Sequence, residues 1–250
     1  MAMLLVCGMA QAADEATVLK LTSPDGVNEV TFSKPGRELT YQVRMNGADV
    51  ILPSRAGLDL DNRVWEMALG KRDLQQPECW MDLLTVDSVR VHQPVDKTWQ
   101  PQYGERSTVR DRYNSATMYM SRHDKSKYRL NVEVRAYDEG IAFRYFFPEH
   151  PDAIFHKVTA DLTDYTFPSG TMAWSEQWAQ AKFDRTGIDE IKHPVERALT
   201  LELPDGKWVA VADADVDDWC LTKFVAREGK PGTLQSVMYS PVDVVTYAAT

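Results

Sequence analysis

The sequence is poor in cysteine, histidine and basic residues, and each shortage argues against a class of function. Its 250 residues include three cysteines, and no pair of them has the spacing of zinc ligands. The five histidines are scattered along the chain: His92, His123, His150, His156 and His193. A glycine-rich phosphate loop and the G-x-S-x-G nucleophile turn are missing as well. The sequence therefore shows none of the common zinc, phosphate-loop or serine-hydrolase patterns.

Basic residues are outnumbered by acidic ones. The chain has 28 Lys and Arg against 37 Asp and Glu, which gives a formal net charge of −9 at pH 7. Because nucleic-acid affinity comes mostly from neutralising phosphates with Lys and Arg, this balance argues against a nucleic-acid partner. The apolar content of 44% and charged content of 26% are those of an ordinary globular protein, long enough to bury a substantial core.

Long apolar runs are also missing, so no stretch reaches the ~20 residues that a membrane-spanning helix needs. A shorter apolar run, Ala2 to Ala10, precedes Ala10-Gln11-Ala12, which has the A-x-A form of a signal-peptide cleavage site. We expect residues 1–12 to be an export signal and residues 13–250 to form the domain. No Lys or Arg precedes Lys20, which is consistent with a truncated signal. A buried N-terminal helix is the alternative.

Two cysteines, Cys79 and Cys220, follow the expected signal. They can form one disulfide in an oxidising compartment or remain two unpaired buried thiols. Their separation in the sequence does not decide between these outcomes.

Alternating strand patterns joined by turn residues recur along the chain. Asn46-Gly47 separates two such patterns and tolerates the positive φ of a tight hairpin turn. Asp138-Glu139-Gly140 and Pro204-Asp205-Gly206 interrupt two further pairs of patterns in the same way. These hairpins predict an all-β fold, a large antiparallel β-sandwich.

Helical patterns are few and short. Residues 62–74 predict one short helix, and residues 174–182 predict a second of about two turns. In the second, Trp174 and Trp178 are four residues apart and would share one helix face. We therefore expect one or two short helices beside the sandwich.

Carboxylates gather beside aromatic residues in two places, and oxygen-rich clusters suit a hard cation such as Ca²⁺. A flat aromatic ring beside a carboxylate also suits a sugar, since the ring packs on the C–H face and the acid binds hydroxyls. The alternative is that both clusters are charged strand ends or loops with core aromatics. The first comprises Glu176, Asp184, Asp189 and Glu190 with Trp174, Trp178 and Phe183; the second comprises Asp213, Asp215, Asp217 and Asp218 before Trp219.

The stretch "WQPQYGERSTVRDRYN", residues 99–114, mixes aromatics with charges. We expect Trp99, Tyr103 and Tyr113 to pack into the core of the sandwich. The charged residues of the stretch are expected to pair across strands or to face a further domain: Glu105, Arg106, Arg110 and Arg112.

Four stretches occur in the order and rough spacing of the N-terminal domain of glycoside hydrolase family 97. The chain resembles that domain over nearly its whole length after the expected signal. The four stretches are "LKLTSPDG", "WQPQYGERSTVRDRYN", "VRAYDEGIAFRYFFP" and "LPDGKWVAVADADVDDW". The resemblance implies a galactose-mutarotase-like β-supersandwich, followed in full-length members by a (β/α)₈ barrel and a C-terminal β domain. It also implies an exported bacterial α-glucosidase or α-galactosidase that depends on Ca²⁺, with its catalytic carboxylates on the barrel.

The resemblance also assigns expected roles. A chain without the barrel would be incomplete at its C-terminus and inactive by itself, located in the bacterial periplasm. Its partners would be the missing barrel and an α-linked oligosaccharide. In this family one N-terminal glutamate joins barrel carboxylates around the calcium. Here Glu176 has the matching residue type and Asp184 the better position, so both are candidate metal ligands, and millimolar affinity is expected without the barrel.

Two other functions compete with this one. A stand-alone carbohydrate-binding module would use Trp174 and Trp178 as its platform. A purely structural or interaction domain would bind no ligand.

Overall fold

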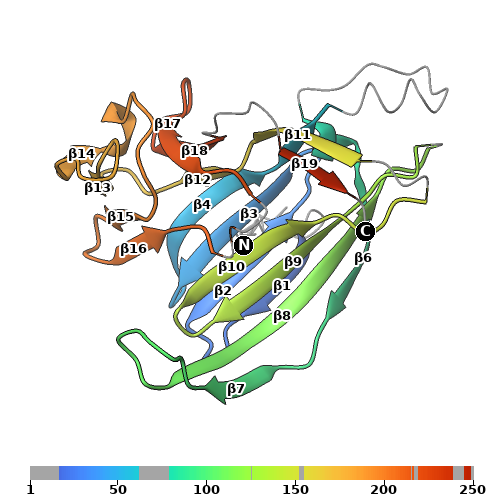
Figure 1. Cartoon of the computed structure of the whole chain (residues 1–250), viewed down its shortest axis with the longest axis horizontal. Helices are drawn as coiled ribbons and strands as arrows, with labels where there is room; N and C mark the ends of the chain where they lie inside the picture. The colour runs from blue at the N-terminus through green and yellow to red at the C-terminus, as the bar shows by residue number, and fades with distance from the viewer. Residues whose placement is uncertain are drawn as a thin grey trace, which may run out of the picture.

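A computed structural model describes residues 17–61, 79–124, 126–151, 155–214, 216, 219–238 and 245–248. The strands described in it form four antiparallel sheets, so the expected all-β fold is confirmed (Figure 1). The largest sheet has the order β1 (Thr17–Thr22), β2 (Asn28–Ser33), β3 (Leu39–Met45), β4 (Ala48–Ala56), β12 (Asp164–Thr166), β18 (Thr233–Met238) and β17 (Thr222–Ala226). The second has the order β10 (Gly140–Phe146), β9 (Arg129–Tyr137), β8 (Val109–Ser121) and β6 (Thr85–Val91), with β7 (Val95–Trp99) also paired to β8.

Two smaller sheets flank these layers. One contains β19 (Val245–Ala248), β11 (Phe155–Asp161) and β5 (Leu58–Leu60). The other, at the left of Figure 1, contains β14 (Asp184–Gly187), β13 (Met172–Ser175), β15 (Leu199–Glu202) and β16 (Trp208–Val211). Two single-turn 3₁₀ helices occur in the described part, η1 (Trp80–Leu83) and η2 (Ile188–Glu190).

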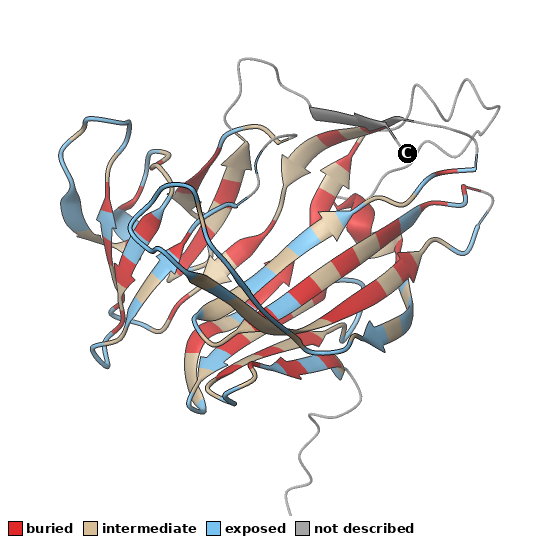
Figure 2. Cartoon of the chain, turned by 60° about the horizontal axis from the view of Figure 1, so that its bottom comes forward, coloured by how far each residue is buried: buried red, intermediate tan, exposed pale blue. Residues whose placement is uncertain are grey.

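The core lies between the two large sheets and follows from strand alternation. Along β9 every second residue is fully buried, namely Leu130, Val132, Val134 and Ala136, and Figure 2 shows this alternation along the strands. Val30 and Phe32 of β2 are buried in the same core. Phe32 meets Phe143 of β10 edge to face, with ring centroids 5.6 Å apart. Apolar burial between the layers therefore holds the sandwich together.

The three predicted hairpins are confirmed. Asn46 and Gly47 join β3 to β4 with φ angles of 49° and 77°, the left-handed pair that the Asn-Gly turn requires. Asp138 and Glu139 join β9 to β10. Gly206 has φ 84° in the turn between β15 and β16.

The helix expected over residues 174–182 is wrong. Trp174 lies in β13, hydrogen-bonded between β14 and β15, and residues 176–183 form the loop to β14. Sheet pairing on both sides of β13 outweighs the weak helical pattern, because the two aromatic side chains of residues 174–182, Trp174 and Trp178, stay exposed and bury no helix face. The helix expected over residues 62–74 lies outside the described residues, as does the signal peptide at residues 1–12.

The expected burial of Trp99 and Tyr103 is wrong as well. Trp99 is 53% exposed at the end of edge strand β7, and Tyr103 is 89% exposed in the loop that follows. Among the described strands β7 pairs with β8 alone and lies at the bottom of Figure 1, so these two rings lie at the margin of the sheet and not between the layers. Tyr113, by contrast, is partly buried, with its ring 4.9 Å from that of Tyr137.

The expected cross-strand charge pair is confirmed for Arg110, whereas Arg106 and Arg112 pair with residues of the turn between β9 and β10. Arg110 of β8 makes a two-pronged contact with Asp96 of β7 at 2.6 and 2.7 Å. Arg112 pairs with Asp138 at 2.8 Å, and Arg106 pairs with Glu139 at 3.2 Å.

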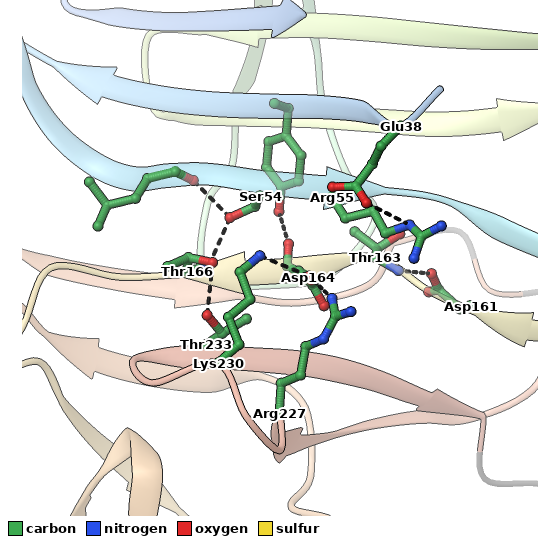
Figure 3. A network of polar contacts seen from close by, with 12 residues as sticks. Glu38, Ser54, Arg55, Asp161, Thr163, Asp164, Thr166, Arg227, Lys230 and Thr233 are labelled. Atoms are coloured by element: carbon green, nitrogen blue, oxygen red, sulfur yellow. Dashed lines mark hydrogen bonds and ion pairs between the residues drawn. The ribbon is translucent and has the colours of Figure 1, made fainter. Parts of the chain in front are cut away.

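A polar network anchors the short strand β12 within the large sheet (Figure 3). The Asp164 carboxylate is almost fully buried and pairs with Arg227 and with Lys230. Its backbone carbonyl accepts a hydrogen bond of 2.7 Å from the buried Tyr41 hydroxyl. On the other side of the strand, the Thr166 amide donates to Ser54 Oγ at 2.8 Å. These contacts satisfy polar groups that the surrounding core would otherwise leave unpaired.

Neither of the two described cysteines forms a disulfide: Cys79 is buried and Cys220 is partly exposed. No helix among the described residues has the length and apolar character needed to cross a bilayer.

Candidate functional site

The loop between β13 and β14 builds the most distinctive site. Ser175 and Asp184 face each other where the two strands end, so residues 176–183 form the connection. Within it the Ala181 amide donates to the Trp178 carbonyl at 2.9 Å, and Gln180 has a φ of 75°, unusual for a residue other than glycine. The turn projects the Trp178 indole outward, 60% exposed.

Backbone contacts hold the start of this loop in place. The Glu176 carbonyl accepts a 2.9 Å hydrogen bond from the Glu196 amide. The Lys223 ammonium donates to the Gln177 carbonyl at 3.0 Å and pairs with the Glu196 carboxylate at 2.7 Å. Both of these charged side chains are largely buried, so a buried ion pair holds the base of the loop.

An open cavity of about 340 Å³ lies beneath the loop. Glu176, Trp178 and Asp184 line it together with Glu190, all from the first carboxylate cluster. Lys182, Lys192 and His193 also line it, so the cavity has mixed charge.

The carboxylates in this cavity differ in the hydrogen bonds and ion pairs that they make. Glu190 accepts a 3.2 Å hydrogen bond from the Gly187 amide, and Asp184 lies 3.4 Å from the Lys182 ammonium with both side chains exposed. Within the described part of the chain, the Glu176 carboxylate makes no hydrogen bond or ion pair. Glu176 and Asp184 are therefore the two carboxylates most available to an added cation.

Another lining atom lacks a partner. Oγ1 of Thr186 is buried and makes no hydrogen bond within the described residues. A ligand with polar atoms in the cavity would satisfy it.

The oxygen set suits calcium but is not a complete cage. Calcium takes six to eight oxygen ligands, and two carboxylates supply only some of them. Among the described residues no group of three or more His, Cys, Asp or Glu side chains is arranged to hold a metal. The candidate ligands Glu176 and Asp184 therefore stay predictions, and most of the shell would have to come from elsewhere.

The structure separates the two tryptophans that the sequence pairs. Trp178 lines the cavity, whereas Trp174 is not among its lining residues. Trp174 points from the opposite face of β13, where it is 37% exposed. The sequence analysis does not identify Trp208, which is 58% exposed on the same outer face as Trp174. The sequence feature that could have identified it is its position at the start of the strand that follows the Gly206 turn.

The second carboxylate cluster has a structural part. Asp213 pairs with the buried guanidinium of Arg197 and accepts a hydrogen bond from Thr222. The Arg197 guanidinium carbon also lies 4.0 Å from the centre of the Phe224 ring. Asp213 thus anchors a buried cation, and the cluster's other three aspartates lie outside the described residues.

Comparisons with known proteins extend these observations. The family model described as "Glycosyl-hydrolase 97 N-terminal" matches residues 21–249. The chain is 29% identical over 245 residues to "Retaining alpha-galactosidase" of Bacteroides thetaiotaomicron, a match that covers 90% of this chain and 33% of that protein. The chain therefore spans about a third of the length of this curated relative.

Solved structures share the fold. A glycoside hydrolase family 97 enzyme from Pseudoalteromonas sp. strain K8, solved in complex with panose, superposes with a TM-score of 0.77 at 21% identity. The match covers 92% of this chain and 33% of that one. A β-arabinopyranosidase structure gives a TM-score of 0.76 at 15% identity, covering 92% of this chain and 38% of the other. Both likenesses support the β-sandwich architecture.

Proposed function

The chain belongs to the glycosyl-hydrolase 97 N-terminal family, as its resemblance implied, and we propose that it serves an exported glycoside hydrolase acting on α-glycosides. In this proposal the β-sandwich packs against a (β/α)₈ barrel that carries the catalytic carboxylates. It contributes one calcium ligand and does not hydrolyse glycosides by itself. The chain matches only a third of an α-galactosidase, so the remaining two thirds of such a protein can hold the catalytic centre. This coverage favours a supporting role for the sandwich beside a separate catalytic domain.

The observation that carries the proposal is the meeting of Glu176 and Asp184 at one cavity. Two carboxylates at an open cavity can complete a calcium shell whose other ligands come from a neighbouring domain. Trp178 and Phe183, 60% and 54% exposed on the same loop, offer apolar surface for that neighbour to cover. The calcium ligand and the docking surface would then adjoin each other.

Calcium titration tests the metal part of the proposal. Isothermal calorimetry on the 250-residue chain should show binding in the millimolar range or weaker, because ligand count and charge set the affinity. At least one of the variants Glu176→Gln and Asp184→Asn should abolish the residual heat, whereas Glu139→Gln, at a distant exposed hairpin, should not. A tight stoichiometric site, or weak binding insensitive to both cavity variants, would contradict the proposal.

Activity and gene structure test the rest. The 250-residue chain should release no nitrophenol from nitrophenyl α-glucoside or α-galactoside. Sequencing the genomic DNA on the 3′ side of the Thr250 codon should reveal a barrel with carboxylates at its strand ends in the same reading frame. A stop codon followed by unrelated sequence would refute this part and favour the stand-alone binding module.

Export to the bacterial periplasm is the final part of the proposal. It is supported by the apolar run from Ala2 to Ala10 and the A-x-A pattern that follows. N-terminal sequencing of the periplasmic protein from an expressing bacterium should begin at residue 13. Retention of the whole chain in the cytoplasm would refute it.

A further inference from the structure

The outer face of the small sheet β14-β13-β15-β16 displays two tryptophans. On its inner face Ala173, Leu199 and Leu201 are fully buried. Because successive side chains of a strand point to opposite faces, Trp174 of β13 and Trp208 of β16 lie on the other side. Their exposed fractions are 37% and 58%.

Strand register sets the spacing of the two indoles. Trp174 is opposite Thr200 of β15, and Trp208 is opposite Glu202, two residues further along β15. Strands about 4.8 Å apart and a rise of about 3.4 Å per residue place the two tryptophan Cα atoms roughly 12 Å apart. This span is comparable to two or three linked pyranose rings.

A neutral ion pair lies between the tryptophans. Arg185 of β14 is opposite Trp174, and its Nε donates to Glu202 Oε2 at 2.9 Å. To make this contact the arginine reaches over β13 to β15, so the pair lies across the middle of the face. Both side chains are partly exposed, at 43% and 32%, and keep polar atoms open to a ligand. A guanidinium and a carboxylate that neutralise each other favour an uncharged polar ligand over an ionic one.

We propose that this face binds a neutral oligosaccharide. Pyranose C–H faces would pack on Trp174 and Trp208, while Glu202 accepts and Arg185 donates hydrogen bonds to the sugar hydroxyls between them. Aromatic rings contribute most at binding surfaces when they combine a large flat apolar area with few rotatable bonds, and both indoles here project from paired strands. The choice of an α-linked sugar rests on the proposed function.

The site is separate from the calcium cavity. Ser175, Asp184 and Thr186 line the cavity, whereas their strand neighbours Trp174 and Arg185 point to the opposite face of the sheet. Sugar binding here should therefore need no metal. A chelator removes calcium from the titration. A failure of sugar binding can therefore be distinguished from a failure of the calcium proposal.

The test is calorimetric titration of the 250-residue chain with maltoheptaose and with an α-galacto-oligosaccharide, in EDTA. At least one should bind, and Trp174→Ala and Trp208→Ala should each weaken that binding about tenfold or more. Trp99→Ala, which removes an equally exposed indole from a distant strand, should leave the affinity unchanged. Trp208→Phe keeps a smaller apolar ring and should retain part of the affinity. Thermal melting of each variant separates loss of binding from loss of folding.

Two outcomes would overturn the inference. One is a failure of the sugar titration: the folded wild-type chain binds no saccharide, or the folded variants at Trp174 and Trp208 bind it as tightly as the wild type does. The other is wild-type self-association in sedimentation velocity that Trp208→Ala abolishes without any sugar binding. That second result would make the face a contact between copies of the chain.

Discussion

Asp164 offers the sharpest test of how the sandwich is held together. Its side chain is 1% exposed, and it pairs with Arg227 and with Lys230, the latter at 3.2 Å (Figure 3). Asp164→Asn keeps the shape of the side chain and removes the charge. Both cations then lose their partner at the junction of β12 and β18.

The expected loss follows from the burial of the three groups. Removing one partner of a buried ion pair costs about 3–5 kcal/mol when the remaining charge stays buried. Here the remaining cations are 31% and 39% exposed and can turn toward water, so we expect about 2–3 kcal/mol. For a chain of this length each kcal/mol lowers the melting temperature by about 2–4 °C, so the expected fall is roughly 4–12 °C.

Calorimetric melting and urea unfolding measure this loss, with Arg110→Gln as the matched control. Arg110 pairs with Asp96 in good geometry, but both side chains are more than half exposed, so its loss should be undetectable. A double-mutant cycle between Asp164→Asn and Arg227→Gln should show coupling of about 1 kcal/mol or more. Full additivity, or a loss at Asp164 no larger than the control, would refute the reasoning.

Three other predictions address the turns and titratable groups. Gly47→Ala should cost about 1 kcal/mol, because φ at Gly47 is 77°, whereas Gly36→Ala, which meets no neighbour and no such φ, should be neutral in urea unfolding. Burial lowers the pKa of His156 to about 4, below the ordinary histidine value of 6.5. The folding stability that comes with the neutral imidazole, up to about 3 kcal/mol, is therefore present above pH 6.5 and is lost as the pH falls through 4. A His156→Gln variant with an unchanged pH dependence of unfolding would contradict this. Burial also raises the pKa of Cys79 to about 11, so iodoacetamide at pH 8 should modify the partly exposed Cys220 before Cys79, as peptide mass spectrometry can follow. Equal rates would count against it.

Much of the candidate cavity could be predicted because its residues are close in sequence. Glu176, Trp178, Asp184 and Glu190 come from one hairpin and the turn after it, so they meet whatever the rest of the fold does. The separation of Trp174 from Trp178 could not be predicted, since it depends on whether the segment forms a helix or a strand. Trp208 was missed because strand register, which places it on the face of Trp174, is a long-range property.

The sequence by itself determined the hairpins and the strand alternation. Asn46-Gly47 and Gly206 set φ angles within one or two residues, and alternating apolar side chains select an extended backbone with one buried face. Only the tertiary structure decided which aromatics are buried. Phe32 packs against Phe143 of the opposing sheet, whereas Trp99 and Trp208 stay 53% and 58% exposed in the described part of the chain. The physical reason is that backbone preferences act locally, whereas burial requires a packing partner that the chain brings from far away.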